Sequence, residues 1–328
     1  MLRAMRPFFI ALVCTWIAIL GAAIFYFRQM AHSHWVMTAA LPAFLIEAFF
    51  YLGSVFKEPR DWIGRVGPPR LRAALLWVSA VIPYCVFALT ADTFQRNAFY
   101  LLAALSAILA FWYVLLPRRP AYDFGFLVIA AAPIIARVFP RIYVSPDPHL
   151  RVDVLGHLMW IRLAIAALFT FRHWNPGEFG FWPRYREWRT GLLWYAVSAI
   201  PIIAMALAIH DVHFEPLHGP WWRVAAIVIG TFFGVLWIVA LSEELFFRGV
   251  IERGLLDSWK SPAVAIVISS LLFGVVHLWF HDYPDWRRAV TASLLGAACG
   301  FAYWQSGSVR SPMVTHAFVV ATWRMFFK

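Results

Sequence analysis

The chain has 328 residues, of which 62% are hydrophobic and 14% are charged, and its mean hydropathy is +0.70. Soluble domains carry about 25% charged residues, so this composition excludes an ordinary water-soluble protein and indicates a membrane protein. The formal net charge of +11 does not predict a nucleic-acid partner. The Arg and Lys residues lie in short loops between apolar runs, where we expect them to orient the spans and to contact anionic lipid headgroups.

Stretches long enough to cross a bilayer, which takes roughly 20 apolar residues, recur along the whole chain. They predict an all-α fold, a polytopic transmembrane helix bundle of about ten to eleven spans. The expected spans are residues 7–27, 35–56, 71–90, 98–116, 121–139, 152–171, 191–209, 222–256, 261–280, 289–304 and 311–327. The irregular stretch from Asn175 to Arg189 divides them into an N-terminal helical block, residues 1–175, and a C-terminal block, residues 190–328.

The first span and the loop charges predict the orientation of the chain. Residues 7–27 are too long for the apolar core of a cleaved signal peptide, so we expect a retained first span. Arg and Lys concentrate at the N-terminus and in the loops 57–72, 118–119 and 184–189. A loop on the opposite side contains Asp211 and Glu215. By the positive-inside rule, this pattern predicts a cytoplasmic N-terminus.

One cluster of ionisable residues lies in the middle of the run 222–256. Ionisable side chains within hydrocarbon are costly and for that reason indicate function. Glu244 and Arg248 are one helical turn apart and are expected to form an ion pair. Glu243 points about 100° away from Glu244 and lacks that partner, so it is the candidate general base. Taken alone, the cluster also fits a structural salt bridge or a helix end at the membrane surface.

The following helix offers Phe273 and His277 on one face, at positions i and i+4. The turn between the two helices falls near residues 257–261. Glu243 lies as far before that turn as His277 lies after it, roughly 22 Å along each helix. In an antiparallel helix pair the two side chains would meet at the same depth and could share a water molecule. His277 is therefore a catalytic candidate, although an isolated His on an apolar face is more often a core residue.

His316 lies in the last apolar run, and helix lengths alone do not place it at the depth of His277. In the preceding helix, Gly296 and Gly300 form a small-xxx-small face that permits close backbone approach. The three cysteines lie within apolar runs without the spacing of metal ligands, and we expect them to be buried small hydrophobes. They are Cys14, Cys85 and Cys299.

Together these residues resemble the motifs of the CAAX-protease and bacteriocin-processing (CPBP) family, the glutamic intramembrane peptidases that include the Rce-type prenyl-protein endopeptidases. The first motif, two glutamates and three residues before an arginine, matches residues 243–248, and Phe-x-x-x-His matches residues 273–277. The third, a histidine followed four residues later by asparagine, matches in part, because His316 is present but Val320 takes the place of the asparagine. The resemblance covers about residues 190–328. The N-terminal spans are more loosely similar to exosortase-associated bacterial members.

The resemblance implies a metal-independent intramembrane endopeptidase, without a cofactor, in the bacterial cytoplasmic membrane. Its substrate would be a membrane-anchored protein or peptide. By carry-over from the motifs, Glu243 and His277 would activate the water, and His316 would stabilise the oxyanion. The remaining motif residues, Glu244, Arg248 and Phe273, would support the site. Neither the particular substrate nor the oligomeric state follows from the motifs.

Val320 favours a second hypothesis, a catalytically weak or inactive membrane scaffold with the same fold. Its side chain cannot donate the hydrogen bond of the family's asparagine. The loss of one oxyanion donor typically costs about 10²–10³ in rate.

Two further hypotheses use other combinations of the intramembrane residues. A proton-coupled transporter would line its path with Glu47, His157 and Glu243, but the sequence has no internal repeat to support it. A zinc peptidase would ligate its metal with Glu243, His277 and His316, but the sequence lacks a His-Glu-x-x-His signature.

Overall fold

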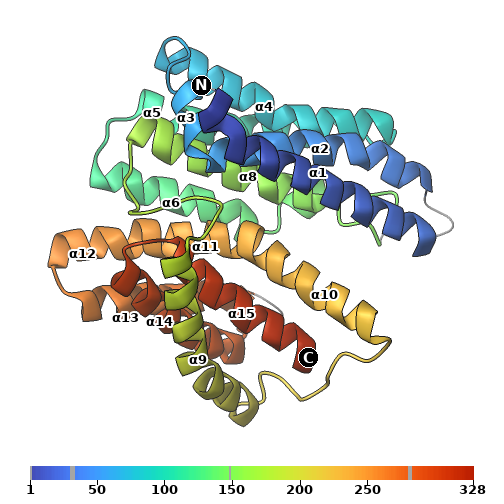
Figure 1. Cartoon of the computed structure of the whole chain (residues 1–328). Coiled ribbons are helices and arrows are strands. Elements are labelled where there is room, and N and C mark those ends of the chain that lie inside the picture. Colours follow the sequence, from blue (N-terminus) through green and yellow to red (C-terminus); the bar gives the residue numbers. More distant parts are fainter. Residues whose placement is uncertain (1, 30–33, 148, 280–282) are drawn as a thin grey trace. The chain divides into compact units, whose positions relative to one another are not determined.

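The computed structural model describes residues 2–29, 34–147, 149–279 and 283–328. Within these ranges the chain is built from helices, and its only β-structure is two isolated bridges, between residues 178 and 308 and between residues 214 and 327. The chain divides into two compact units, Met1–Trp174 and Asn175–Lys328. Each unit is a bundle of helices (Figure 1). The predicted all-α bundle is confirmed, whereas the roles predicted for the two blocks stay predictions.

The first unit contains eight α-helices among its described residues. They are α1 (Leu2–Gln29), α2 (His34–Val55), α3 (Lys57–Ile63), α4 (Pro69–Thr90), α5 (Arg96–Leu115), α6 (Pro120–Ile135), α7 (Phe139–Ile142) and α8 (Asp153–Ala167), which continues as the π-helical turn η1 (Leu168–Arg172). At its centre, α8 packs against α2, α4 and α5.

A buried charge network holds the centre of this unit together. Nε of Arg162 on α8 donates to Oε1 of Glu47 on α2 over 2.6 Å. The same guanidinium donates to Oγ and to the backbone oxygen of Ser79 on α4, over 2.9 and 2.8 Å. Arg162 and Glu47 are almost completely buried, so each charge depends on the other for its partner. The pairing with Arg162 on a neighbouring helix is therefore sufficient to explain why a carboxylate is buried at Glu47.

The second unit begins with α9 (Tyr185–Ala208) and ends with α15 (Arg310–Phe326). Between them, one continuous helix of 39 residues, Trp221–Trp259, is followed by α13 (Pro262–Val276), the short 3₁₀ turn η4 (His277–Trp279) and α14 (Trp286–Ser306). The long helix consists of α10 (Trp221–Gly234), η2 (Val235–Ala240), α11 (Leu241–Glu244), η3 (Leu245–Glu252) and α12 (Arg253–Trp259). The segments η2 and η3 are π-helical, an irregularity that occurs frequently at functional sites.

Eight helices of the described residues are long and apolar enough to cross a membrane, so the chain is an integral membrane protein. Each of the eleven predicted spans contains a helix, although α6 ends at Ile135, before the end of the predicted span 121–139, and three of the helices fall short of this criterion. The helix α6 has only 16 residues, and α14 and α15, which correspond to the predicted spans 289–304 and 311–327, are not among the eight. Residue 280, the end of the predicted span 261–280, lies outside the described residues.

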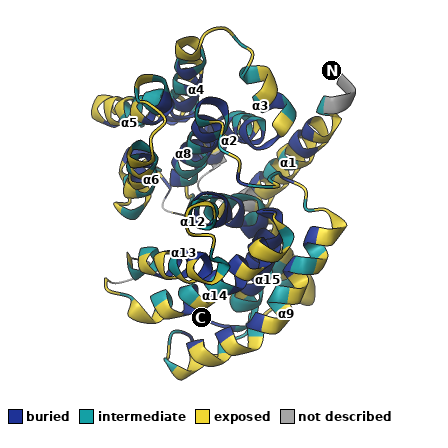
Figure 2. Cartoon of the chain, turned by 90° about the vertical axis from the view of Figure 1, so that its left-hand side faces the viewer, coloured by how far each residue is buried: buried dark blue, intermediate teal, exposed yellow. Residues whose placement is uncertain are grey.

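The helix α15 is a core helix of its unit, which explains its low hydropathy. Its residues 310–317 are all buried, whereas α9 is mostly exposed (Figure 2). The hydroxyl of Thr315 donates to the backbone oxygen of Gly191 on α9 over 2.9 Å. A Cβ at Gly191 would lie 2.7 Å from the backbone oxygen of Ser311 and 2.6 Å from Cβ of Val314, so the backbone of α9 lies directly against α15. This close contact fixes the position of His316, the next residue of α15.

The turn from α14 to α15 is also held in place. Gly307 closes α14 in the left-handed region, at φ +65°, where glycine is favoured. Its oxygen accepts from the backbone nitrogen of Glu178, whose own oxygen accepts from Val309. Arg310 forms a buried ion pair with Glu187 at 2.6 Å. The start of α15 is therefore tied to the segment that precedes α9.

The helices α13 and α14 approach each other through small residues, as the glycine pattern predicts. A Cβ at Gly296 would lie 3.0 Å from Cα of Ser270, and a Cβ at Gly274 would lie 1.9 Å from Oγ of Ser293. At Gly300 the added atom would lie 3.0 Å from both Ile266 and Glu252. The predicted close approach is confirmed, and it brings α13 and α14 against the charged part of the long helix.

Candidate active site

The two adjacent glutamates of α11 lie in different surroundings. Glu244 is completely buried. The side chain of Glu243 keeps 33% of its accessible surface, which leaves it within reach of a water molecule or a substrate. The helical geometry that separates neighbouring residues by about 100° therefore produces one enclosed carboxylate and one accessible carboxylate.

Arg248 neutralises the enclosed carboxylate. Its Nε lies 3.1 Å from Oε2 of Glu244, and both side chains are fully buried. The guanidinium also donates to the backbone oxygen of Gly296 over 2.7 Å and lies over the ring of Phe273, 4.8 Å from its centre. The predicted i,i+4 ion pair is thus present, and it joins the long helix to α13 and α14.

His277 lies where α13 ends and η4 begins. Its Nδ1 is 2.7 Å from the backbone oxygen of Phe273, and the two rings are 4.7 Å apart. A carbonyl oxygen only accepts hydrogen bonds, so Nδ1 carries the proton. In the neutral ring, Nε2 then holds the lone pair that can accept a proton from water.

His316 lies between the two glutamates. Its Nδ1 is 2.7 Å from Oε1 of Glu244, and its Nε2 is 3.9 Å from Oε2 of Glu243. The ring is almost completely buried and meets the ring of Phe273 edge-on, at 5.9 Å and 88°. The depth of His316, which helix lengths left open, is therefore the depth of the glutamate pair.

Phe273 is the common neighbour of these groups. Arg248, His277 and His316 all contact its ring, which is 1% exposed. The long helix, α13, η4 and α15 thus bring an accessible carboxylate, a buried ion pair and two imidazoles to one place.

Residues 225–322 match the model of a family described as type II CAAX prenyl endopeptidase Rce1-like. Over these residues the chain is similar to the CAAX protease family. The matched residues contain the two complete motifs, the partial third motif and the whole site described above. No curated protein and no solved structure matches the chain. The exosortase-associated subgroup, for which these findings give no support, stays a prediction.

The candidate site includes a cysteine that the motifs do not mention. Cys299 on α14 is completely buried, and its Sγ lies 3.7 Å from the backbone oxygen of Pro312. Its Sγ, a carboxylate oxygen of Glu244 and a ring nitrogen of His316 lie within 4.8 Å of one another. These donor types could hold a metal ion, but the Arg248 guanidinium beside Glu244 disfavours a second cation. This trio also differs from the Glu243, His277 and His316 ligands of the zinc hypothesis.

A third glutamate lies on the same helix face as Glu244 and Arg248 of the first motif. Glu252 is completely buried, and its Oε2 accepts a hydrogen bond from Oγ of Ser269 on α13 over 2.9 Å. It lies two turns after Glu244 and one turn after Arg248, so the i,i+4,i+8 spacing could have identified it. Sequence reasoning missed it because its position near the end of the apolar run resembles an interfacial residue.

Val320 lies one helical turn after His316 on α15 and is partly exposed. Its isopropyl group offers no hydrogen-bond donor, so the departure from the family's third motif is also a chemical departure. The preceding residue of the helix, Val319, is buried in the core cluster that also contains Phe273. Along this turn of α15, apolar packing therefore takes the place of a polar side chain.

Proposed function

We propose that the chain is a metal-independent intramembrane endopeptidase that hydrolyses a peptide bond in a membrane-anchored protein or peptide. The observation that carries this proposal is the position of His316. It lies between the accessible Glu243 and the enclosed Glu244, and its ring contacts Phe273, which the ring of His277 also contacts. A purely structural ion pair needs neither the exposed carboxylate nor a second imidazole.

In the first step, Glu243 and Nε2 of His277 orient a water molecule and accept its proton. The water oxygen attacks the carbonyl carbon of the scissile peptide bond, and the carbonyl oxygen becomes an oxyanion. Proton transfer of this kind typically contributes 10²–10⁴ in rate. The hydrogen bond from Nδ1 of His277 to the Phe273 oxygen supports this role, because it keeps the lone pair on the other nitrogen.

His316 stabilises the oxyanion by donating from Nε2. This requires a proton on each ring nitrogen, and the carboxylate of Glu244 accepts the hydrogen bond from Nδ1. In the second step the carbon–nitrogen bond breaks, and the leaving amine takes the proton held by Glu243 and His277. Glu244 and Arg248 do not touch the substrate in this mechanism but hold His316 and Phe273 in place.

The test is hydrolysis by the purified full chain in proteoliposomes. The probe is a fluorescence-quenched peptide that ends in a prenylated CAAX sequence, alongside the same peptide without the prenyl group. We expect Glu243→Gln to lower the rate at least about 10²-fold, and the exposed control Glu215→Gln to leave it unchanged. A chelator should not change the wild-type rate. Wild-type rates in Glu243→Gln would end the proposal.

A catalytically weak or inactive scaffold of the same fold is the second candidate, and Val320 is the observation that favours it. This candidate expects no hydrolysis of either peptide by the wild type. It also expects the fold and a bound partner to survive Glu243→Gln unchanged.

A further inference from the structure

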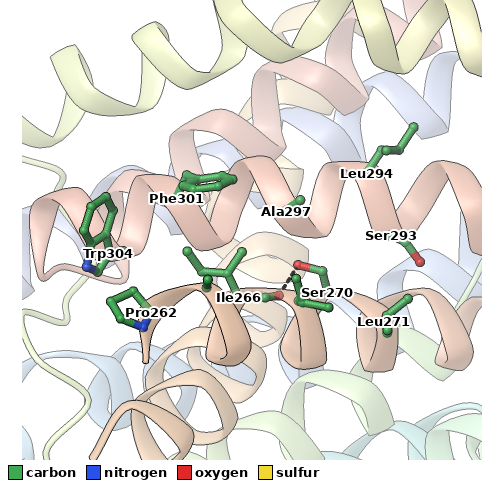
Figure 3. A pocket seen from close by; sticks show the side chains of 11 residues that line it. Pro262, Ile266, Ser270, Leu271, Ser293, Leu294, Ala297, Phe301 and Trp304 are labelled. Atoms are coloured by element: carbon green, nitrogen blue, oxygen red, sulfur yellow. Dashed lines mark hydrogen bonds between the residues drawn. The ribbon is translucent and has the colours of Figure 1, made fainter. Parts of the chain in front are cut away.

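The second unit has an apolar groove on its outer surface, between α13 and α14, with a volume of about 560 Å³. Figure 3 shows its two ends. Pro262 and Trp304 lie at one end, and Leu271 lies near the other. The small side chain of Ala297 lies between them, at the middle of the groove (Figure 3). The groove is separate from the proposed catalytic residues, none of which lines it.

The lining of the groove favours an apolar ligand. Apart from the indole N–H of Trp304, the described residues that line it have polar side chains only at Ser270 and Ser293. Each hydroxyl already donates to a carbonyl oxygen of its own helix, Ser270 to Ile266 over 2.6 Å and Ser293 to Ala289 over 2.8 Å. The remaining lining is hydrocarbon or aromatic, and several of these side chains are more than half exposed, such as Val267 and Leu271. A ligand here gains by burying apolar surface.

The dimensions of the groove select a single hydrocarbon chain. Along α13 it runs from Pro262 to Leu271, which is about 14 Å at the rise of an α-helix. The hydrocarbon core of a bilayer is about 30 Å thick, so the groove covers about one leaflet. A transmembrane helix of a partner would have to contact the full thickness, whereas one tail of a phospholipid ends at the middle of the bilayer.

One end of the groove carries the features of a membrane interface. Trp304 at that end is 52% exposed, and Trp259, three residues before Pro262, is 56% exposed. Tryptophan prefers the level of the headgroups. Lys260 lies two residues before Pro262 and is exposed, and no carboxylate of the described residues forms an ion pair with it. In the predicted orientation this end faces the cytoplasm, where the leaflet surface is negative.

We propose that this groove binds one acyl chain of an anionic phospholipid, with its headgroup at Lys260. The site is independent of the peptidase reaction and holds a lipid of the surrounding leaflet against α13 and α14. Apolar burial provides the affinity for the tail, and the ammonium group provides the preference for a negative headgroup.

The test is photo-crosslinking in proteoliposomes with a phosphatidylglycerol that carries a diazirine on its tail, read out by peptide mass spectrometry. We expect the label on the groove-lining peptides of α13 and α14. Ala297→Phe fills the groove and should lower the label about tenfold. The matched control is Val264→Phe, which adds the same ring at an exposed position of α13 outside the groove, and it should leave the label unchanged.

The headgroup is tested with Lys260→Gln and with a phosphatidylcholine probe that carries the same tail. Each change should lower the label about fivefold, and thermal unfolding should be the same for all variants. Equal labelling by the two lipids would overturn the assignment of an anionic ligand. Unchanged labelling of Ala297→Phe would overturn the site itself. Displacement by a free isoprenoid alcohol, but not by unlabelled phosphatidylglycerol, would overturn the phospholipid in favour of a prenyl chain.

Discussion

Nδ1 of His316 lies 2.7 Å from Oε1 of Glu244, whose other oxygen lies 3.1 Å from Nε of Arg248. This row of imidazole, carboxylate and guanidinium joins α15 to the long helix and, through the hydrogen bond from Arg248 to the Gly296 oxygen, to α14. The pairing explains why a pair of glutamates is needed. Glu244 holds the site together, and in the proposed mechanism Glu243 is the carboxylate that acts on the water molecule.

Glu244→Gln should therefore be strongly destabilising as well as inactivating. The amide leaves the buried Arg248 charge without its carboxylate partner, and breaking such a pair costs about 3–5 kcal/mol. The free energy of unfolding, measured by denaturant titration in mixed micelles, checks this. Glu215→Gln is the control, because Glu215 lies in a loop and its ion pair with Lys328 is accessible to solvent. Equal stability of the two variants would contradict the role given to Glu244.

Val320→Asn restores the residue of the family's third motif and should raise the rate of hydrolysis. If Val320 leaves the oxyanion with one donor too few, the gain should approach about 10²-fold, in kcat more than in KM. Val319→Asn is the comparison, since Val319 packs in the core cluster and should lose stability without gaining activity. An unchanged kcat in Val320→Asn would mean that another donor, such as a backbone group, already fills the position.

The buried network of Arg162 and Glu47 in the first unit predicts that a double substitution lowers the free energy of unfolding less than a single substitution does. Arg162→Met leaves Glu47 charged and buried, at a cost of about 3–5 kcal/mol. Adding Glu47→Gln removes that charge and should recover most of the loss. Denaturant titration of the two variants checks this. A double variant less stable than Arg162→Met would contradict the pairing at 2.6 Å.

The sequence predicted contacts between residues that are close in the chain, but not contacts between residues that are far apart in it. The pair of Glu244 and Arg248 follows from i,i+4 spacing, and the helices follow from apolar runs. The contact between His316 and Glu244 joins residues 72 positions apart, and no helical rule gives its distance. The π-helical segments η2 and η3 were not predicted, because apolar patterns do not distinguish a π-helix from an α-helix. The helices in the windows 289–304 and 311–327 fall below the length and hydropathy criterion that eight other helices meet, because polar and charged residues interrupt their apolar runs.

Two helical glycines with different surroundings predict opposite effects of substitution by alanine. Gly274→Ala would place its Cβ 1.9 Å from Oγ of Ser293 and 2.5 Å from the backbone oxygen of Ala289, so it should be destabilising by about 1–3 kcal/mol. Gly230→Ala in α10 meets nothing within 4 Å and should stabilise the helix by up to about 1 kcal/mol. Thermal unfolding of both variants decides. Equal and small effects would contradict the packing.

The central claim is that Glu243 and His277 act on one water molecule, and a double-mutant cycle on hydrolysis tests it most directly. Rates of the prenylated reporter peptide would be measured for Glu243→Gln, His277→Gln and the double variant, with stability matched by thermal unfolding. Residues that act as a unit give strongly non-additive losses, so the double variant should be about as slow as the slower single variant. Losses that multiply, or wild-type rates in either single variant, would contradict the account.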